Sequence, residues 1–439
     1  MKKCALHNLG CKVNSYETQA MQQLMEAAGY EIVPFGEGAA DIFIINTCSV
    51  TNIADRKSRQ MIHRARAMNP EAVIVASGCY TESAGETRDG DIDIVIGNNE
   101  KSRLVEILDS YFAGSPREER EDISKVRGFD GMSIDKPSEH TRAYVKIQDG
   151  CNRFCSYCII PYVRGRIRSR DKEEALDEIK RLADGGCLEV VLTGIHLSSY
   201  GLDFKSDKNV TLIDIIEETD RIEGIERIRL GSLEPLIVTE DFVQRLSKCR
   251  KVCPHFHLSL QSGCDSVLAR MNRRYTAKEF AAGVELLRKY FDKPAITTDV
   301  IVGFPGETEE EFAETEEFVR RIGFYELHVF KYSRRGGTVA DRMDGQVTDS
   351  VKSKRSEALL AIDEELSLDY RREYIGRRVK VLLEEKITFE GRCYITGFTD
   401  TYVRVAVEDG DERLAPNSIV NVRVSGLLGK EMVIGVAEN

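Results

Sequence analysis

The stretch that decides the fold reads AYVKIQDGCNRFCSYCIIP and runs from Ala143 to Pro161. It begins as a strand pattern and then places Cys151, Cys155 and Cys158 within eight residues. Helical patterns, for example over 172–184, 277–290 and 308–320, separate it from further strand patterns at 188–193, 227–231, 255–260, 295–302 and 326–332. Six such units predict a barrel or partial barrel, which carries its chemistry at the C-terminal ends of the strands, where this cysteine triplet lies.

The N-terminal part of the chain also alternates between strand and helix patterns. Helical patterns at 14–28 and 54–68 separate strand patterns at 3–8, 41–46, 72–77 and 91–97. This alternation predicts an open, doubly wound parallel sheet. Cys11, Cys48 and Cys79 each follow one of its strands. Because open parallel sheets bind ligands beyond the carboxyl ends of their strands, the three thiols are expected at one edge, although single cysteines are also common as small buried hydrophobes.

The C-terminal part shows a third pattern. A long helical pattern over 350–374 is followed, from Arg378 onward, by five short alternating strands, which fit a small closed β-barrel of the OB kind. The segment before the central part is rich in charge, Gly and Pro and is interpreted as a linker. We therefore expect an α/β chain with an N-terminal sheet domain, a linker, a central partial barrel and a C-terminal barrel, over residues 1–113, 114–140, 141–374 and 375–439.

Composition narrows the class of protein. Apolar residues make up 42% and charged residues 31% of the 439 positions, as in ordinary globular proteins. No stretch approaches the roughly 20 apolar residues of a membrane span, and the N-terminus lacks the apolar core of a secretory signal, so we expect a cytoplasmic protein without a membrane partner. The net charge of −11 argues against binding of nucleic acid, DNA included, by the whole surface, but leaves room for a local basic groove.

The spacing of the Cys151, Cys155 and Cys158 triplet points to a metal cluster. Zinc sites usually take four ligands, often in pairs, and no fourth cysteine or histidine lies near this triplet in the sequence. A [4Fe–4S] cluster also normally takes four thiolates, so three would leave one iron open to a substrate or cofactor. A structural zinc or a set of buried free thiols are the alternatives.

The motif DGCNRFCSYCIIP resembles the signature of the radical S-adenosylmethionine (SAM) superfamily. The resemblance implies a [4Fe–4S] cluster whose open iron binds the amino and carboxylate groups of SAM, and cleavage of SAM to a 5′-deoxyadenosyl radical. It also implies that Tyr157 packs near the adenine. The chain has LTGIHLSSYG where many members have Gly-Gly-Glu-Pro. Further candidate SAM contacts, each of which could instead be a turn glycine or a structural polar group, are Thr193, Gly194, Ser232, Glu234, Gln261, Asp299 and Gly303.

Three N-terminal motifs, LGCKVNSYET, INTCSVT and GCY, precede the radical SAM loop and together resemble the methylthiotransferase family over essentially the whole chain. That resemblance implies a second [4Fe–4S] cluster held by Cys11, Cys48 and Cys79, which carries or supplies the inserted sulfur. One SAM would methylate sulfur and another would supply the radical. The C-terminal barrel is similar to the family's RNA-binding TRAM domain. No catalytic residue is expected beyond the cluster cysteines.

Residues Lys12, Val13 and Asn14 are most similar to the branch that inserts a methylthio group at C2 of N6-threonylcarbamoyladenosine at position 37 in the tRNA anticodon loop. The branch acting on N6-isopentenyladenosine usually has GCQMN here, and the branch acting on a ribosomal protein has GCPKN. Both remain alternatives, as does a non-enzymatic RNA-binding iron–sulfur protein. The resemblance implies an electron donor such as flavodoxin or ferredoxin.

Two arginine clusters are candidates for binding RNA phosphates, since guanidinium groups suit phosphate recognition. Solvated loops are the alternative interpretation. His196 and His328 have no metal-ligand spacing and are interpreted as structural or substrate-contacting residues, while Cys249 and Cys253 are interpreted as structural. The candidate RNA contacts are Arg164, Arg166, Arg168, Arg170, Arg334 and Arg335.

Overall fold

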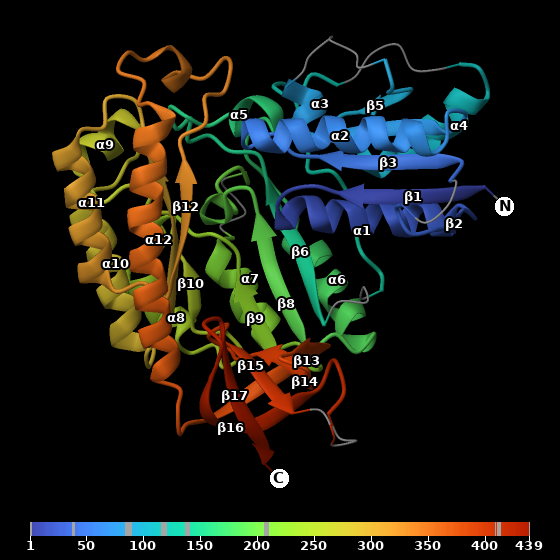
Figure 1. Ribbon diagram of the computed structural model, residues 1–439. Coiled ribbons are helices and arrows are strands. Elements are labelled where there is room, and N and C mark those ends of the chain that lie inside the picture. Colours follow the sequence, from blue (N-terminus) through green and yellow to red (C-terminus); the bar gives the residue numbers. More distant parts are fainter. Residues whose placement is uncertain are drawn as a thin grey trace.

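A computed structural model shows three parts that follow one another along the chain (Figure 1). An N-terminal parallel sheet lies beside the C-terminal strand ends of a central partial barrel, and a small closed barrel lies at the opposite ends of those strands. This confirms the predicted α/β class with its two parallel sheets and C-terminal barrel. The structure describes residues 2–36, 40–83, 90–115, 121–136, 141–205, 210–408, 410 and 414–438.

The N-terminal sheet is parallel, with strand order β2-β1-β3-β4-β5. Its central strand β3 is buried at every position, because helices cover both faces of a doubly wound sheet. The strands are β1 (Lys3–Asn8), β2 (Glu31–Ile32), β3 (Ile42–Thr47), β4 (Val73–Gly78) and β5 (Ile94–Ile96). The helices are α1 (Lys12–Ala27), α2 (Asn52–Met68), α3 (Cys79–Ser83), η1 (Lys101–Arg103) and α4 (Leu104–Phe112).

The central part is an open barrel built from two sheets, with strand orders β7-β6-β8-β9 and β10-β11-β12. An isolated bridge between Leu233 and Leu258 joins them. Strand β10 is shorter than the predicted 255–260 because the backbone leaves the ladder after His257: the Leu260 N–H bonds the Thr298 side chain, and Gln261 has a φ of +71°. The strands are β6 (Arg142–Asp149), β7 (Arg168–Ser169), β8 (Glu189–Gly194), β9 (Arg227–Leu230), β10 (His255–His257), β11 (Ala295–Val302) and β12 (Glu326–Lys331).

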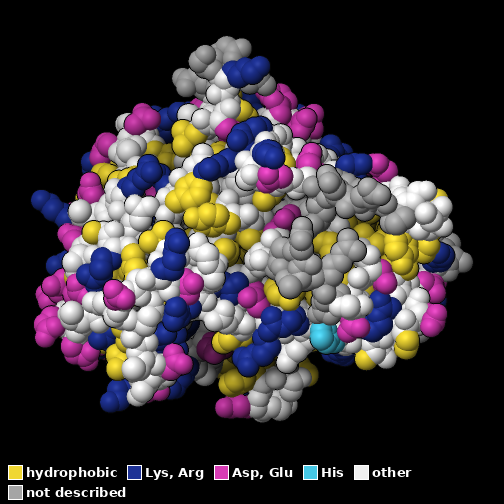
Figure 2. All heavy atoms as spheres, turned by 90° about the horizontal axis from the view of Figure 1, so that it is seen from above, with side chains coloured by type: hydrophobic (Ala, Val, Ile, Leu, Met, Phe, Trp, Pro, Cys, Tyr) yellow, Lys and Arg dark blue, Asp and Glu magenta, His cyan; other side chains and the backbone are white. Residues whose placement is uncertain are grey.

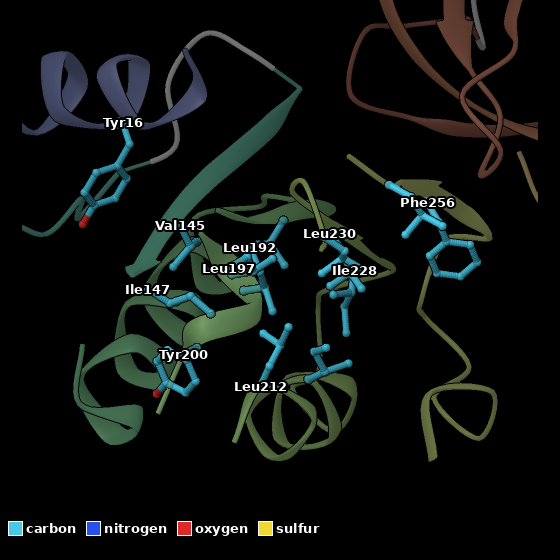
Figure 3. Packing of buried hydrophobic residues seen from close by; sticks show 14 of the residues in the cluster. Tyr16, Val145, Ile147, Leu192, Leu197, Tyr200, Leu212, Ile228, Leu230 and Phe256 are labelled. Atoms are coloured by element: carbon cyan, nitrogen blue, oxygen red, sulfur yellow. The ribbon is translucent and has the colours of Figure 1, made fainter. Parts of the chain in front are cut away.

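Helices cover the outer face of this barrel (Figure 1). Figure 3 shows the packing there, with Val145, Leu192 and Leu230 of the strands directed toward Leu212 of α7. Burying such side chains contributes about 1.5–3 kcal/mol each. The helices are α5 (Ile160–Val163), α6 (Lys172–Asp184), α7 (Leu212–Asp220), α8 (Glu240–Leu246), α9 (Asp265–Arg270), α10 (Ala277–Tyr290), α11 (Glu309–Ile322) and α12 (Asp349–Arg372), with short η2 (Leu197–Ser199), η3 (Pro235–Ile237) and η4 (Ala340–Arg342).

The C-terminal strands close into the predicted five-stranded barrel, in the order β13-β14-β15-β17-β16. Arg229 of β9 ties this barrel to the central part, donating to the Asp400 carbonyl at 2.8 Å. The Tyr402 ring lies 4.5 Å from the Arg229 guanidinium and so covers the lower end of the partial barrel. The strands are β13 (Arg378–Phe389), β14 (Arg392–Phe398), β15 (Arg404–Glu408), β16 (Ile419–Leu428) and β17 (Met432–Glu438).

The expected linker is packed where the structure describes it. Ile123, Met132 and Ile134 are buried, and the Met132 carbonyl accepts a hydrogen bond of 2.8 Å from Tyr16 of α1. Residues 121–136 therefore form part of the contact between the N-terminal sheet and the partial barrel. No helix among the described residues is long and apolar enough to cross a membrane.

Candidate functional site

The loop that carries Cys151, Cys155 and Cys158 has a fixed backbone. Gly150 has a φ of +68°, and a Cβ there would lie 1.9 Å from the Arg166 carbonyl oxygen, so only glycine fits. The Cys151 N–H donates to the Gly165 carbonyl at 3.1 Å. The turn after α9 holds the other end of the loop, since the Ser156 N–H bonds the Met271 carbonyl at 3.0 Å.

The loop thiols lie close together in a protein environment with donors directed at sulfur. Burial raises the pKa of Cys151 to about 11 and that of Cys158 to about 12, and the neighbouring Cys155 raises both further. The Arg273 guanidinium lies 3.2 Å from the Cys155 sulfur. The Arg153 N–H lies 3.4 Å from the Cys151 sulfur. Such donors stabilise thiolate ligands and tune iron–sulfur clusters.

The N-terminal thiols follow three neighbouring strands of the sheet. Cys11 lies between β1 and α1, Cys48 follows β3, and Cys79 begins α3 directly after β4. Burial raises the pKa of Cys48 to about 11, and the adjacent Cys79 and Cys11 thiols raise it further. A Cβ at Gly10 would lie 2.9 Å from the Cys48 sulfur, so the glycine permits the first and second strand ends to approach.

The donor set of each triad fits an iron–sulfur cluster. Within the described ranges, no group of three or more His, Cys, Asp or Glu side chains could hold a metal ion, which argues against the structural zinc alternative. A cluster gives each thiolate its own iron, so its ligands lie farther apart than those of one ion. Three thiols and sulfur-directed donors at each triad match that requirement.

Glu234, one of the predicted SAM contacts, sits in a polar cluster beside the loop. It pairs with the Arg153 guanidinium, and its carboxylate lies 3.4 Å from His196 Nε2. Burial opposes ionisation, but His196 and Arg153 hold the pKa of Glu234 below its usual value. The His196 N–H in turn bonds the Gln148 side chain at 2.6 Å. His196 is thus a positioning residue, as its lack of ligand spacing predicted.

The other predicted SAM contacts lie on the same strand ends with different exposures. Thr193 is buried, Gly194 contacts Gln148, and Ser232 is exposed. Tyr157 is half-buried, with its ring 6.5 Å from that of Phe304.

Two further candidates occupy β11 and the turn after it. Asp299 lies 3.3 Å from His257 and faces the inside of the barrel. The Gly303 N–H already donates to Glu307 at 2.6 Å, and a Cβ on Gly303 would meet Lys352 at 2.3 Å. Of the predicted Gly303 group, therefore, the N–H has its partner within the protein.

The expectation that the arginine clusters face RNA is wrong for four of the six residues. Arg164, Arg168 and Arg170 are at most 3% exposed, because they pair with carboxylates between the N-terminal sheet and the barrel. Arg170 binds Glu178 at 2.8 Å, and Arg168 lies 3.4 Å from Asp149.

Arg335 is the fourth buried arginine. It bonds Ser49 at 2.6 Å and Asp55 at 2.8 Å across to the N-terminal domain. The neighbouring Arg334 is exposed and pairs with Asp341 at 3.0 Å. Arg166 is also exposed, with its guanidinium 4.6 Å from the Phe154 ring.

The buried arginines assemble a charge network that the sequence did not reveal. Arg164 donates to Glu17 of α1 at 2.5 Å and to the Cys79 sulfur at 3.4 Å. Lys146 of β6 bonds Glu17 and Asp149, each at 2.7 Å. Lys101 is also paired with Glu17. No local signal marks these residues, since their partners are 84 to 147 positions apart.

The N-terminal domain therefore spans the open barrel. Arg164 and Arg170 fix it to the β6 edge, and Arg335 fixes it to the loop after β12. Both thiol triads lie at this junction. Figure 2, seen from above, shows basic and acidic side chains interspersed over the face, with apolar side chains gathered near its middle.

Comparison with known proteins agrees with this arrangement. Residues 145–319 match the Radical SAM superfamily, and residues 3–97 match the uncharacterized protein family UPF0004. The fold is similar to that of TsrM, a radical SAM methyltransferase from Kitasatospora setae, with a TM-score of 0.56, 14% identity and coverage of 75% of this chain and 73% of that one.

Curated relatives cover nearly the whole chain. It is 42% identical to the threonylcarbamoyladenosine tRNA methylthiotransferase MtaB of Bacillus subtilis (strain 168), over 97% of this chain and 94% of the relative. It is 34% identical to a tRNA-2-methylthio-N(6)-dimethylallyladenosine synthase of Carboxydothermus hydrogenoformans, over 95% of both chains. The chain belongs to the radical SAM methylthiotransferase family.

Proposed function

We propose that this enzyme inserts a methylthio group at C2 of N6-threonylcarbamoyladenosine at position 37 of tRNA. The observation that carries the proposal is the 42% identity, over 97% of the chain, to the Bacillus subtilis relative of that name. The two thiol triads at one junction supply the structural counterpart, because inserting sulfur at an unreactive carbon needs a sulfur source beside the radical chemistry.

Each triad is assigned one [4Fe–4S] cluster. Cys151, Cys155 and Cys158 would hold the cluster that binds SAM, and Cys11, Cys48 and Cys79 the auxiliary cluster. When bound, the clusters and SAM supply the radical and the methylthio group. The protein's own part is to bury the thiols, direct Arg273 at Cys155 and Arg164 at Cys79, and keep water from the reacting atoms.

The SAM contacts are proposed from their positions around the loop. The half-buried Tyr157 would pack on the adenine, and the exposed Ser232 would contact SAM. Glu234 and the backbone at Gly194 are placed for the SAM amino group, since Glu234 is ionised and lies beside the Cys151 loop through Arg153. Thr193, Gln261, Asp299 and Gly303 complete the proposed set.

The tRNA is proposed to bind through its anticodon loop, with the C-terminal barrel as a second RNA platform. Among the predicted arginines, Arg166 and Arg334 are the exposed ones and remain the proposed phosphate contacts. The proposed units are the auxiliary-cluster domain (1–113), the linker (114–140), the radical SAM domain (141–374) and the TRAM-like domain (375–439). An electron donor such as flavodoxin or ferredoxin and a cytoplasmic location complete the proposal.

Nucleoside mass spectrometry of total tRNA, in cells with and without this gene, tests the proposal. We expect the methylthio form of threonylcarbamoyladenosine to disappear on deletion and to return with the wild-type gene. A variant with Cys151, Cys155 and Cys158 replaced by Ala should not restore it. Loss of the methylthio-dimethylallyl form instead would assign the other tRNA branch, which is also found among the relatives. An unchanged nucleoside profile would overturn the proposal.

A further inference from the structure

The inner face of β10, β11 and β12 carries an accessible row of polar side chains. Val300 and Leu327 belong to the core with Phe318 of α11, so the alternate residues Asp299 and His328 point the other way, into the barrel. Asp299 and His328 are paired across β11 and β12. His328 is exposed, and Asp299 is 29% exposed, on a face that the covering helices do not reach.

Most polar groups around this row already have partners. His257 bonds Thr297 at 3.0 Å and lies 3.3 Å from Asp299. Its ring also contacts His328, at 5.4 Å between centroids and nearly perpendicular.

The arginines below the row are partnered as well. Arg142 and Arg229 bond Glu189 at 2.8 and 2.9 Å. Arg142 also pairs with Glu384, and the Tyr402 ring covers both guanidinium groups. None of these arginines is free to bind a ligand.

Lys12 is different. It follows Cys11 at the start of α1, it is exposed, and it makes no hydrogen bond or ion pair with any residue that the structure describes. Yet it lies within the electrostatic reach of Asp299, Arg229 and His255, residues of the barrel's inner face. The N-terminal domain, fixed across the barrel by Arg164 and Arg335, therefore places one uncompensated cation opposite the row of β11 and β12.

We propose that Lys12 and His328 form the subsite that binds the carboxylate of the threonylcarbamoyl group. This rests on the proposed function. The threonyl part of that nucleoside carries a free carboxylate, whereas a dimethylallyl group carries no charge. A lysine without a counter-ion and an imidazole that can donate one hydrogen bond match the carboxylate. Since Lys12 adjoins Cys11, the subsite would also hold the adenine near the auxiliary triad.

Binding of short anticodon stem-loop RNAs tests the subsite without turnover. The reconstituted full-length protein, without reductant, is titrated with stem-loops carrying threonylcarbamoyladenosine, its methyl ester, dimethylallyladenosine or adenosine. We expect the wild type to bind the first RNA most tightly. Lys12→Met should weaken that RNA at least about tenfold and leave the methyl ester unchanged, whereas Lys12→Arg should keep the preference. His328→Ala should lower the same preference.

Controls separate the possible failures. Lys180→Met removes an exposed lysine on α6 and should change nothing, and iron content must stay equal in all variants. Equal weakening of every RNA by Lys12→Met would assign Lys12 to the phosphate backbone and overturn the subsite alone. A preference that persists in Lys12→Met would do the same. A wild type without preference for the carboxylate would overturn the proposed substrate, and the subsite with it.

Discussion

The guanidinium of Arg164 lies 2.5 Å from the carboxylate of Glu17, and both side chains are fully buried. Arg164 comes just after the cysteine loop of the barrel, and Glu17 lies on α1 of the N-terminal domain. The same guanidinium donates to the sulfur of Cys79. One arginine therefore joins the two domains and touches a thiol of the second triad.

Arg164→Leu should destabilise this junction by about 3–5 kcal/mol, because it leaves Glu17 charged and buried with fewer partners. The free energy of unfolding in urea measures the effect. Arg166→Leu, which replaces an exposed arginine two residues away, should stay within about 0.5 kcal/mol. Equal stabilities of the two variants would contradict this role of Arg164.

Replacing Cys151, Cys155 and Cys158 by Ala should remove about four iron atoms per chain and leave the other cluster in place. Replacing Cys11, Cys48 and Cys79 should do the converse. Iron analysis and electron paramagnetic resonance of the reduced proteins would distinguish the two. Full iron content in either triple variant would show that the triad does not hold a cluster.

Gly150→Ala should disturb the cysteine loop, because its φ is +68° and the new Cβ would meet the Arg166 carbonyl oxygen. We expect a loss of roughly 1–3 kcal/mol of stability, together with reduced iron content. Gly336→Ala is the matched control, since a Cβ at that position meets no atom within 4 Å. Normal iron content in Gly150→Ala would show that the loop tolerates the shift.

Stability should fall at acidic pH through Glu189. Burial alone would raise the pKa of Glu189, but Arg229 and Arg142 outweigh it and hold the pKa at about 2, against an ordinary value of 4.5. The folded pKa is depressed, so this contribution of about 3 kcal/mol is complete above pH 4.5 and is lost as the pH falls toward 2. Unfolding in urea across that range should show a shallower slope for Glu189→Gln. An unchanged slope would contradict the assignment.

The sequence by itself determined the order of elements and the local placement of the cysteines. Strand and helix patterns repeat within short windows, so hydrophobic periodicity reports them directly, as for β11 and α10, whose bounds match the predicted ones. The end of β10 was missed because a side chain, Thr298, takes the place of a ladder partner. The family motifs likewise lie within a few residues of one another.

Only the tertiary structure decided what the charged residues do. Arg164, Arg168 and Arg170 form an alternating basic run, which in isolation fits a solvent-exposed phosphate site. Their counter-charges, Glu17 on α1 and Glu178 on α6, reach them only through the docking of two domains. Lys12 shows the converse, since its place opposite β11 and β12 depends on that docking too. Local sequence fixes backbone patterns, whereas burial and pairing of charge depend on contacts distant in sequence.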